Sequence, residues 1–100
     1  MTVFSSNPST GIGPLGVVPA ASANGTPLGT LPDGAVGARV YLSAGASMTF
    51  TVTDTPPTAP PSAVFTISQA SCGPNWDEAL AGGQMIYVTA TAGVPLFRWF

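Results

Sequence analysis

The chain has 100 residues and carries a net charge of -2, with two arginines, four acidic residues, no lysine and no histidine. Only 6% of its residues are charged, whereas an average protein has about 25%. Acid–base or nucleophilic catalysis therefore has few side chains to use, so we expect no enzyme and no cofactor. Two arginines are also too few to displace the counterions of a nucleic acid.

Apolar stretches are all short, since Pro, Gly, Thr or Ser interrupts each one well before the ~18 residues of a membrane helix. The first residues lack the cationic and apolar regions of a secretory signal, so we expect synthesis in a cytoplasm. A soluble domain standing alone usually has roughly 25–35% charged residues on its surface. So small a fraction of charged residues indicates that other subunits cover the surface.

Residues 1–34 are rich in Gly, Pro, Ser, Thr and Asn, with short apolar islands between them. Proline removes donors from a strand ladder and glycine weakens strands, so this composition favours an extended arm over a packed unit. One short strand is expected near residues 15–20. A disordered tail is the alternative. We therefore divide the chain into an arm, 1–34, and a β-sandwich domain, 35–100.

The first solid strand is expected at residues 38–43, after the turn tripeptide Pro32, Asp33 and Gly34. Residues 47–53 follow, where Met48, Phe50 and Val52 alternate with Ser and Thr. Alternation with a period of two predicts one buried face and one threonine-rich outer face. The short connection between the two strands predicts a hairpin.

Four prolines in residues 54–61 exclude a central strand and predict a stiff, exposed loop. A strand is expected at 63–68. Residues 75–80 are interpreted as one helical turn that Asn75 caps and Gly82 and Gly83 end. Another strand is expected at 85–90 because its residues are β-branched or aromatic.

The last strand, residues 95–100, is apolar on both faces, which predicts that both faces are covered. Arg98 is then an interfacial charge, or it pairs with Asp54 or Glu78. We expect the arm and this strand to contact neighbouring subunits. The candidate interface residues are Ile12, Leu15, Val17, Val18, Leu96, Phe97, Arg98, Trp99 and Phe100.

Candidate chemical sites are weak. Cys72 has no histidine or lysine as a base and is interpreted as a small apolar filler, with an intermolecular disulfide as the alternative. Asp77 and Glu78 are adjacent on the expected helical turn and do not face each other. Four scattered acidic residues do not predict a calcium site, no histidine accompanies the cysteine for zinc, and no glycine-rich phosphate loop is present.

From residue 31 onward the chain resembles small virion proteins of tailed bacteriophages. The resemblance lies in the turn at 31–35, the strand at 37–42, the proline-rich loop at 55–60, the glycine–glutamine turn at 81–85 and the apolar segment at 96–100. It implies a β-sandwich or jelly-roll-like barrel that decorates or cements a capsid. The middle strand departs from the pattern, because it carries Thr and Ser where similar proteins carry more charge.

These observations predict an all-β fold, a small antiparallel β-sandwich or jelly-roll-like barrel with an extended N-terminal arm. The functional hypothesis is a virion structural protein, a capsid cement or decoration protein on the capsid surface. Its expected partners are the major capsid protein and copies of itself in a homo-oligomer. A tail, fibre or head–tail joint component is one alternative. A glycan-binding module that uses Tyr41, Trp76, Tyr87 and Trp99 is another.

Overall fold

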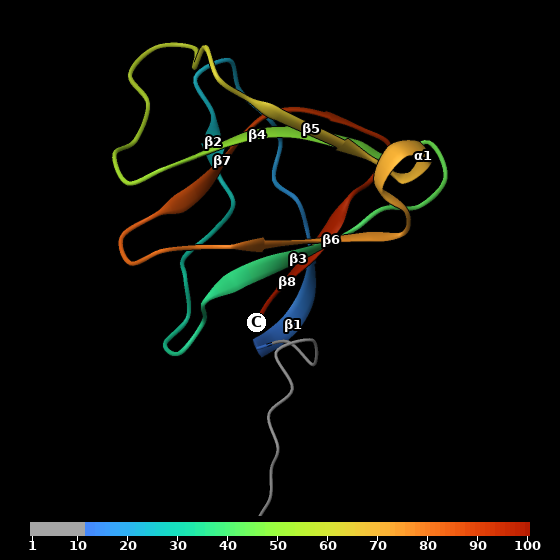
Figure 1. The fold of residues 1–100 in the computed structure, drawn as a ribbon, viewed down its shortest axis with the longest axis horizontal. Helices are drawn as coiled ribbons and strands as arrows, with labels where there is room; N and C mark the ends of the chain where they lie inside the picture. The colour runs from blue at the N-terminus through green and yellow to red at the C-terminus, as the bar shows by residue number, and fades with distance from the viewer. Residues whose placement is uncertain (1–11) are drawn as a thin grey trace, which may run out of the picture.

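A computed structural model describes residues 12–100, which form two antiparallel four-stranded sheets and one short helix (Figure 1). The expected all-β sandwich architecture is therefore confirmed. The elements in chain order are β1 Ile12–Val17, β2 Thr26–Pro27, β3 Gly37–Tyr41, β4 Ser47–Thr53, β5 Phe65–Ser68, α1 Gln69–Cys72, β6 Asn75–Ala79, β7 Met85–Ala92 and β8 Leu96–Trp99.

The first sheet has the strand order β1-β8-β3-β6, and the second has the order β2-β7-β4-β5. Strand β8 comes last in the chain but lies inside its sheet, between β1 and β3. The strand expected at residues 95–100 is thus confirmed and is hydrogen-bonded on both sides. It offers no free strand edge to a neighbouring subunit.

The core lies between the two sheets and contains side chains from both. Met48 and Phe50 are fully buried on β4, as the alternating pattern predicts, and they pack with Val40, Ile86 and Val88. The threonines of β4 lie on the opposite face. One of them, Thr51, is nevertheless only 9% exposed.

Residues 12–34 are part of the sandwich, which corrects the division into an arm at 1–34 and a domain at 35–100. Strand β1 pairs with β8 in the first sheet, and β2 pairs with β7 in the second. Val18 and Leu28 are buried in the core. The apolar islands between the prolines and glycines thus gain enough burial to order this segment. Residues 1–11, the remainder of the expected arm, lie outside the described residues.

The hairpin expected between β3 and β4 does not form. These two strands belong to different sheets, and residues 42–46 carry the chain from one sheet to the other. Leu42 and Ala46 are both buried in this connection. A hairpin turn is usually polar and solvated, whereas burying these two side chains favours the crossing.

The helical turn expected at residues 75–80 is a strand instead. Asn75–Ala79 forms β6 and pairs along its length with β3. The helical turn occurs just before it, as α1, where the hydroxyl of Ser68 accepts a hydrogen bond from the N–H of Ser71. Strand pairing with β3 satisfies the backbone of β6 and overrides its weak local helix preference.

Candidate assembly surface

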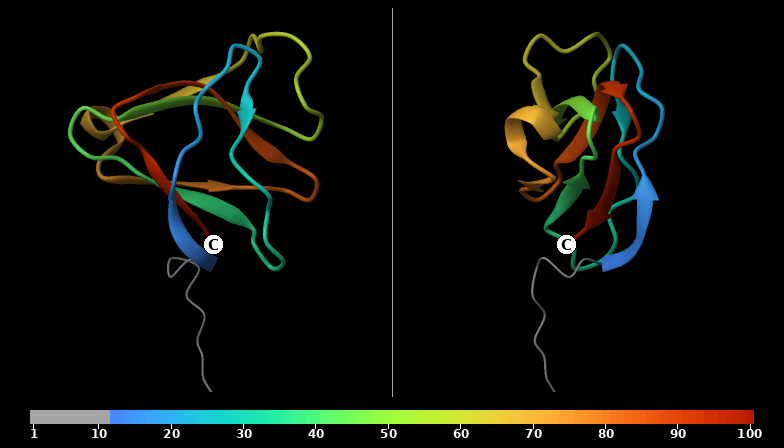
Figure 2. Two further views of the ribbon diagram at one scale, coloured as in Figure 1. Left: turned by 180° about the vertical axis from the view of Figure 1, so that it is seen from behind. Right: turned by 90° about the vertical axis from the view of Figure 1, so that its right-hand side faces the viewer.

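The sandwich has two sides, where the edge strands of the two sheets lie one above the other. Strands β1 and β2 lie on one side, and β5 and β6 lie on the other, as the front and side views show together (Figures 1 and 2). We call them the β1/β2 side and the β5/β6 side. The two sides differ in whether a segment of the chain covers them.

On the β1/β2 side, a segment of the chain covers the gap between the two sheets. Residues 18–25 run from the first sheet to the second, and backbone hydrogen bonds fix the start and the middle of this segment. The N–H of Val18 donates to Pro95 at 3.0 Å, and that of Ser22 donates to Val88 at 3.4 Å. Val18, the first residue of this segment, is only 6% exposed. This side of the core is therefore covered.

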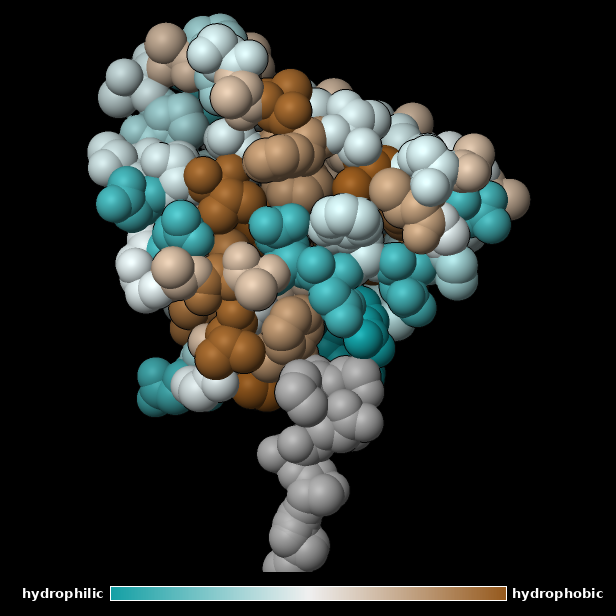
Figure 3. Space-filling view, in the orientation of Figure 1, coloured by the Kyte–Doolittle hydropathy of each residue, from teal (hydrophilic) through white to brown (hydrophobic). Residues whose placement is uncertain are grey.

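The β5/β6 side is open except at one end, where α1 joins the two strands (Figure 1). Phe65 and Trp76 lie opposite the buried Phe50 and Val40 in their sheets, so both face the interior. They are nevertheless 58% and 38% exposed. Apolar surface is visible along this side in the space-filling view (Figure 3). Large side chains of core type therefore reach solvent here.

Few charges reach the surface anywhere in the chain. Among the charged residues only Asp33, Asp54 and Asp77 are exposed. Asp77 forms a two-pronged ion pair with Arg39, in which Nε to Oδ1 is 2.5 Å and Nη2 to Oδ2 is 2.7 Å. The hydrogen bonds from Arg39 lower the pKa of Asp77 and raise that of Arg39. The pair joins β3 to β6 on the outer face of the first sheet.

Arg98 lies directly opposite Arg39 and shares that outer face. Glu78 lies on the other face of the sheet, opposite the buried Ala38, and accepts a 3.0 Å hydrogen bond from the Trp76 indole. The expected pairing of Arg98 with Glu78 is thus excluded by the register. Asp54 lies just after β4, a strand of the second sheet, whereas Arg98 lies on β8 of the first sheet, so the two are not strand neighbours either.

The nine predicted interface residues lie on two neighbouring strands or directly after them, because β1 pairs with β8. Their exposures differ. Leu15 and Val17 are 44% and 63% exposed, whereas Val18 and Trp99 belong to the core. Ile12 and Phe97 pack against the core, and Leu96, Arg98 and Phe100 are half-buried.

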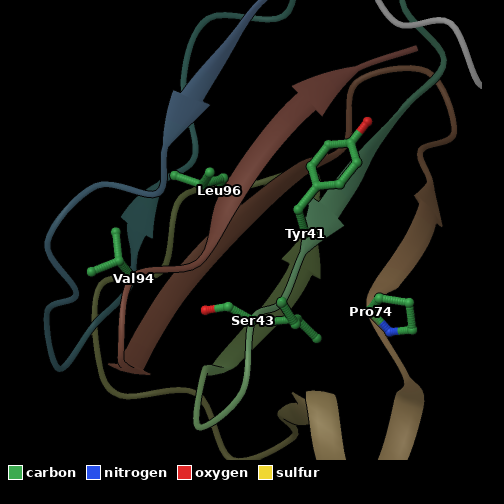
Figure 4. A pocket seen from close by; sticks show the side chains of 6 residues that line it. Tyr41, Ser43, Pro74, Val94 and Leu96 are labelled. Carbon is green, nitrogen blue, oxygen red and sulfur yellow. The ribbon is translucent and has the colours of Figure 1, made fainter.

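A pocket of about 260 Å³ opens where β3 ends and β8 begins. It is lined by Tyr41, Leu42, Ser43, Pro74, Val94 and Leu96 (Figure 4). Val94 is 61% exposed and Leu96 pairs in register with the exposed Val17. We call the apolar area formed by Leu15, Val17, Val94 and Leu96 the β1–β8 surface.

The proline-rich loop after β4 is exposed, as expected, but it also folds back over the threonine-rich face. Thr51, Thr53 and Thr55 line a pocket of about 300 Å³ with Pro57 and Pro61. This cover explains why Thr51 is buried although it points away from the core. The threonine-rich face of β4 is therefore partly covered by the loop and partly exposed to solvent.

Residues 12–100 contain no group of three or more His, Cys, Asp or Glu side chains placed to hold a metal. Cys72 is half-buried, with its sulfur 3.6 Å from the Ser71 hydroxyl. No helix in the described chain is long and apolar enough to cross a bilayer. No family model, curated protein or solved structure matches the sequence.

Several exposed apolar residues were not singled out from the sequence. Val36, Val64, Phe65 and Val94 are 43–61% exposed. Phe65 alternates with Thr66 as any half-buried strand residue does, so the pattern alone gives it a core position. Only the place of β5 at the edge of its sheet exposes the ring.

Proposed function

We propose that this chain is a non-enzymatic virion structural protein of a tailed bacteriophage, which cements or decorates the capsid by contacts between subunits. The observation that carries the proposal is an apolar, almost uncharged surface on a well-packed sandwich. The resemblance of residues 31–100 to small virion proteins supports the same function. Its partners are the major capsid protein and copies of itself.

Exposed apolar area is the main support. Val17 and Val94 are each more than 60% exposed. Val94 lines the pocket together with Leu96, and Val17 is the register partner of Leu96. Contiguous apolar patches on a soluble domain mark interaction sites more often than chance exposure. The β1–β8 surface is therefore the proposed capsid contact, and it contains three of the nine residues predicted from the sequence.

Low charge fits the same role. With three exposed charged residues in the chain, little electrostatic repulsion opposes close packing of many copies. Contacts through this surface depend on apolar burial and hydrogen bonds between uncharged groups. Such contacts are expected to tolerate high salt, because screening weakens interactions between charges.

The test is to purify the particles made by cells that carry this gene and to count copies by quantitative mass spectrometry. Hundreds of copies in each particle support a cement or decoration protein. About a dozen copies would place the protein in a tail, fibre or head–tail joint instead. Absence from purified particles would overturn the virion function.

A variant pair tests the surface. Val17→Asp places a charge on the β1–β8 surface and should abolish binding to purified heads. Thr58→Asp introduces the same charge in the exposed proline-rich loop and should leave binding unchanged. Binding of Val17→Asp at the level of the unmodified protein would contradict a capsid contact at the β1–β8 surface.

A further inference from the structure

The edge strands differ in how they are protected against pairing with another chain. An edge presents unpaired N–H and C=O groups, and natural sheets protect it with proline, bulges, very short strands or charges. Four strands lie at sheet edges in the described part of the chain, namely β1, β2, β5 and β6. Each can be compared for these features.

Three of these edges are protected. Strand β1 contains Pro14 and an irregular register between Ile12 and Gly16. Strand β2 has two residues, one of them Pro27. Strand β6 carries Asp77 and Glu78, which would oppose the same acidic residues if β6 paired with a copy of itself.

Strand β5 is four residues long and lacks the other protections. Phe65–Ser68 contains no proline, glycine or charged residue and has a regular register with β4. No charged residue occurs between Asp54 and Asp77. Its first residue, Phe65, is 58% exposed and follows Val64, which is 43% exposed. This edge is thus open, uncharged and apolar at one end.

The backbone register shows which groups of β5 point outward. The Gln69 N–H donates to the Ala46 carbonyl at 3.2 Å, and hydrogen-bonded and non-hydrogen-bonded pairs alternate along an antiparallel ladder. Gln69 and Ala46 are therefore a hydrogen-bonded pair. Three residues earlier along β5, Thr66 and Thr49 form a non-hydrogen-bonded pair, in agreement with their 3.0 Å hydroxyl contact. The N–H and C=O of Thr66, like those of Ser68, therefore point away from β4.

We propose that β5 pairs with β5 of a second copy of this chain, antiparallel and centred on Thr66, so that two second sheets join into one. In this register Thr66 faces Thr66 of the other copy, and Phe65 faces its Ile67. Cross-strand threonine pairs and aromatic–β-branched pairs are both favourable. The exposed Phe65 ring is then covered on its open side.

A second copy fits this edge better than a partner of different sequence for two reasons. An antiparallel pair about a two-fold axis lets both copies use the same outward groups of Thr66, so the Thr66 N–H of each copy meets the Thr66 carbonyl of the other. The uncharged segment also opposes no like charges. This self-association goes beyond the proposed capsid contact and does not depend on it, because the β1–β8 surface lies on the other sheet.

The test places a charged side chain at the centre of the pair and measures dimerisation by sedimentation equilibrium. The unmodified chain should form a concentration-dependent dimer. Thr66→Lys and Thr66→Glu each place like charges opposite one another and should raise the dissociation constant about fivefold or more. An equimolar mixture of the two variants should restore the dimer, because Lys then faces Glu. Thr58→Lys is the control and should dimerise normally.

A monomer at all concentrations, or an unaffected Thr66→Lys dimer, would overturn the proposal. Hydrogen exchange on the unmodified chain gives a second readout that needs no variant. The amides of Thr66 and Ser68 should exchange more slowly as concentration rises, while the Ile67 amide, which faces β4, should not change. Equal rates for Thr66 at low and high concentration would also overturn it. Loss of head binding by Val17→Asp with the dimer intact separates the two proposals.

Discussion

The two sides of the sandwich use the same kinds of side chain with opposite results. On the β1/β2 side, residues 18–25 cross between the sheets and Val18 is buried at 6% exposure. On the β5/β6 side only α1 bridges the sheets, and Phe65 is 58% exposed although it faces inward. An apolar strand residue is thus buried or available for contact according to what covers its edge, and not according to its own type.

The largest effect is expected from two phenylalanines that lie opposite each other. Phe50 and Phe65 are register partners with ring centroids 5.9 Å apart. Phe50 is fully buried, so Phe50→Ala should lower the free energy of unfolding by about 3–5 kcal/mol. Phe65→Ala, on the open side, should cost about 1 kcal/mol or less at concentrations where the chain is monomeric. Urea denaturation measures both, and similar losses would contradict the contrast between covered and open positions.

Leu28 tests whether the covered side belongs to the folded unit. It is 3% exposed, and its N–H donates to Ile86 at 2.9 Å. Leu28→Ala should therefore cost about 2–4 kcal/mol. The matched variant Leu15→Ala, at a position 44% exposed, should change stability by less than about 1 kcal/mol. No loss from Leu28→Ala would mean that residues 12–34 pack as a dispensable arm.

Gly37 tests the contact between β3 and the edge strand β6. A Cβ at this position would lie 2.5 Å from the Glu78 carbonyl oxygen and 2.6 Å from the Phe100 ring. Gly37→Ala should push β6 away from β3 and cost about 1–3 kcal/mol in thermal or urea unfolding. Gly82→Ala is the control, because a Cβ there meets no atom within 4 Å. Equal stability of the two variants would argue against this close approach.

The smallest effect is expected from the ion pair on the outer face. Because Arg39 lowers the pKa of Asp77 in the folded chain, the pair stabilises the fold above the carboxyl's unfolded pKa. That stability is lost as pH falls through the lowered pKa. The side chains are 23% and 46% exposed, so the contribution should be under about 1 kcal/mol.

Asp77→Asn should remove this part of the acid-induced loss of stability, measured by urea unfolding between pH 7 and pH 2. Asp54→Asn, which removes the same charge from an exposed loop, is the control. An unchanged pH profile for Asp77→Asn would show that the pair adds nothing in solution.

Local patterns predicted the strands well where one face is buried. The alternation of Met48, Phe50 and Val52 gave the bounds of β4 because burial follows the two-residue period of a strand. Both the turn at 32–34 and the glycine pair before β7 also occur where expected. These features depend on residues that are close in sequence.

What the sequence did not reveal depends on partners far away along the chain. Residues 75–79 became a strand because β3 pairs with them across more than thirty residues, and no local signal records that. The crossing from β3 to β4 and the burial of Val18 and Leu28 likewise depend on the second sheet. Likewise, the exposure of Phe65 follows from strand order, since nothing in residues 63–68 shows that β5 lies at an edge.

The central place of β8 has a consequence for folding. The first sheet has β8 between β1 and β3, so β1 and β3 cannot be joined until residues 96–99 have left the ribosome. The earliest strand of this sheet must wait for the latest, and its pairing closes a loop of nearly the whole described chain. Such long-range pairing slows folding. In the second sheet, β4 and β5 are separated only by the proline-rich loop, so this pair is expected to form before β1 is joined to its sheet.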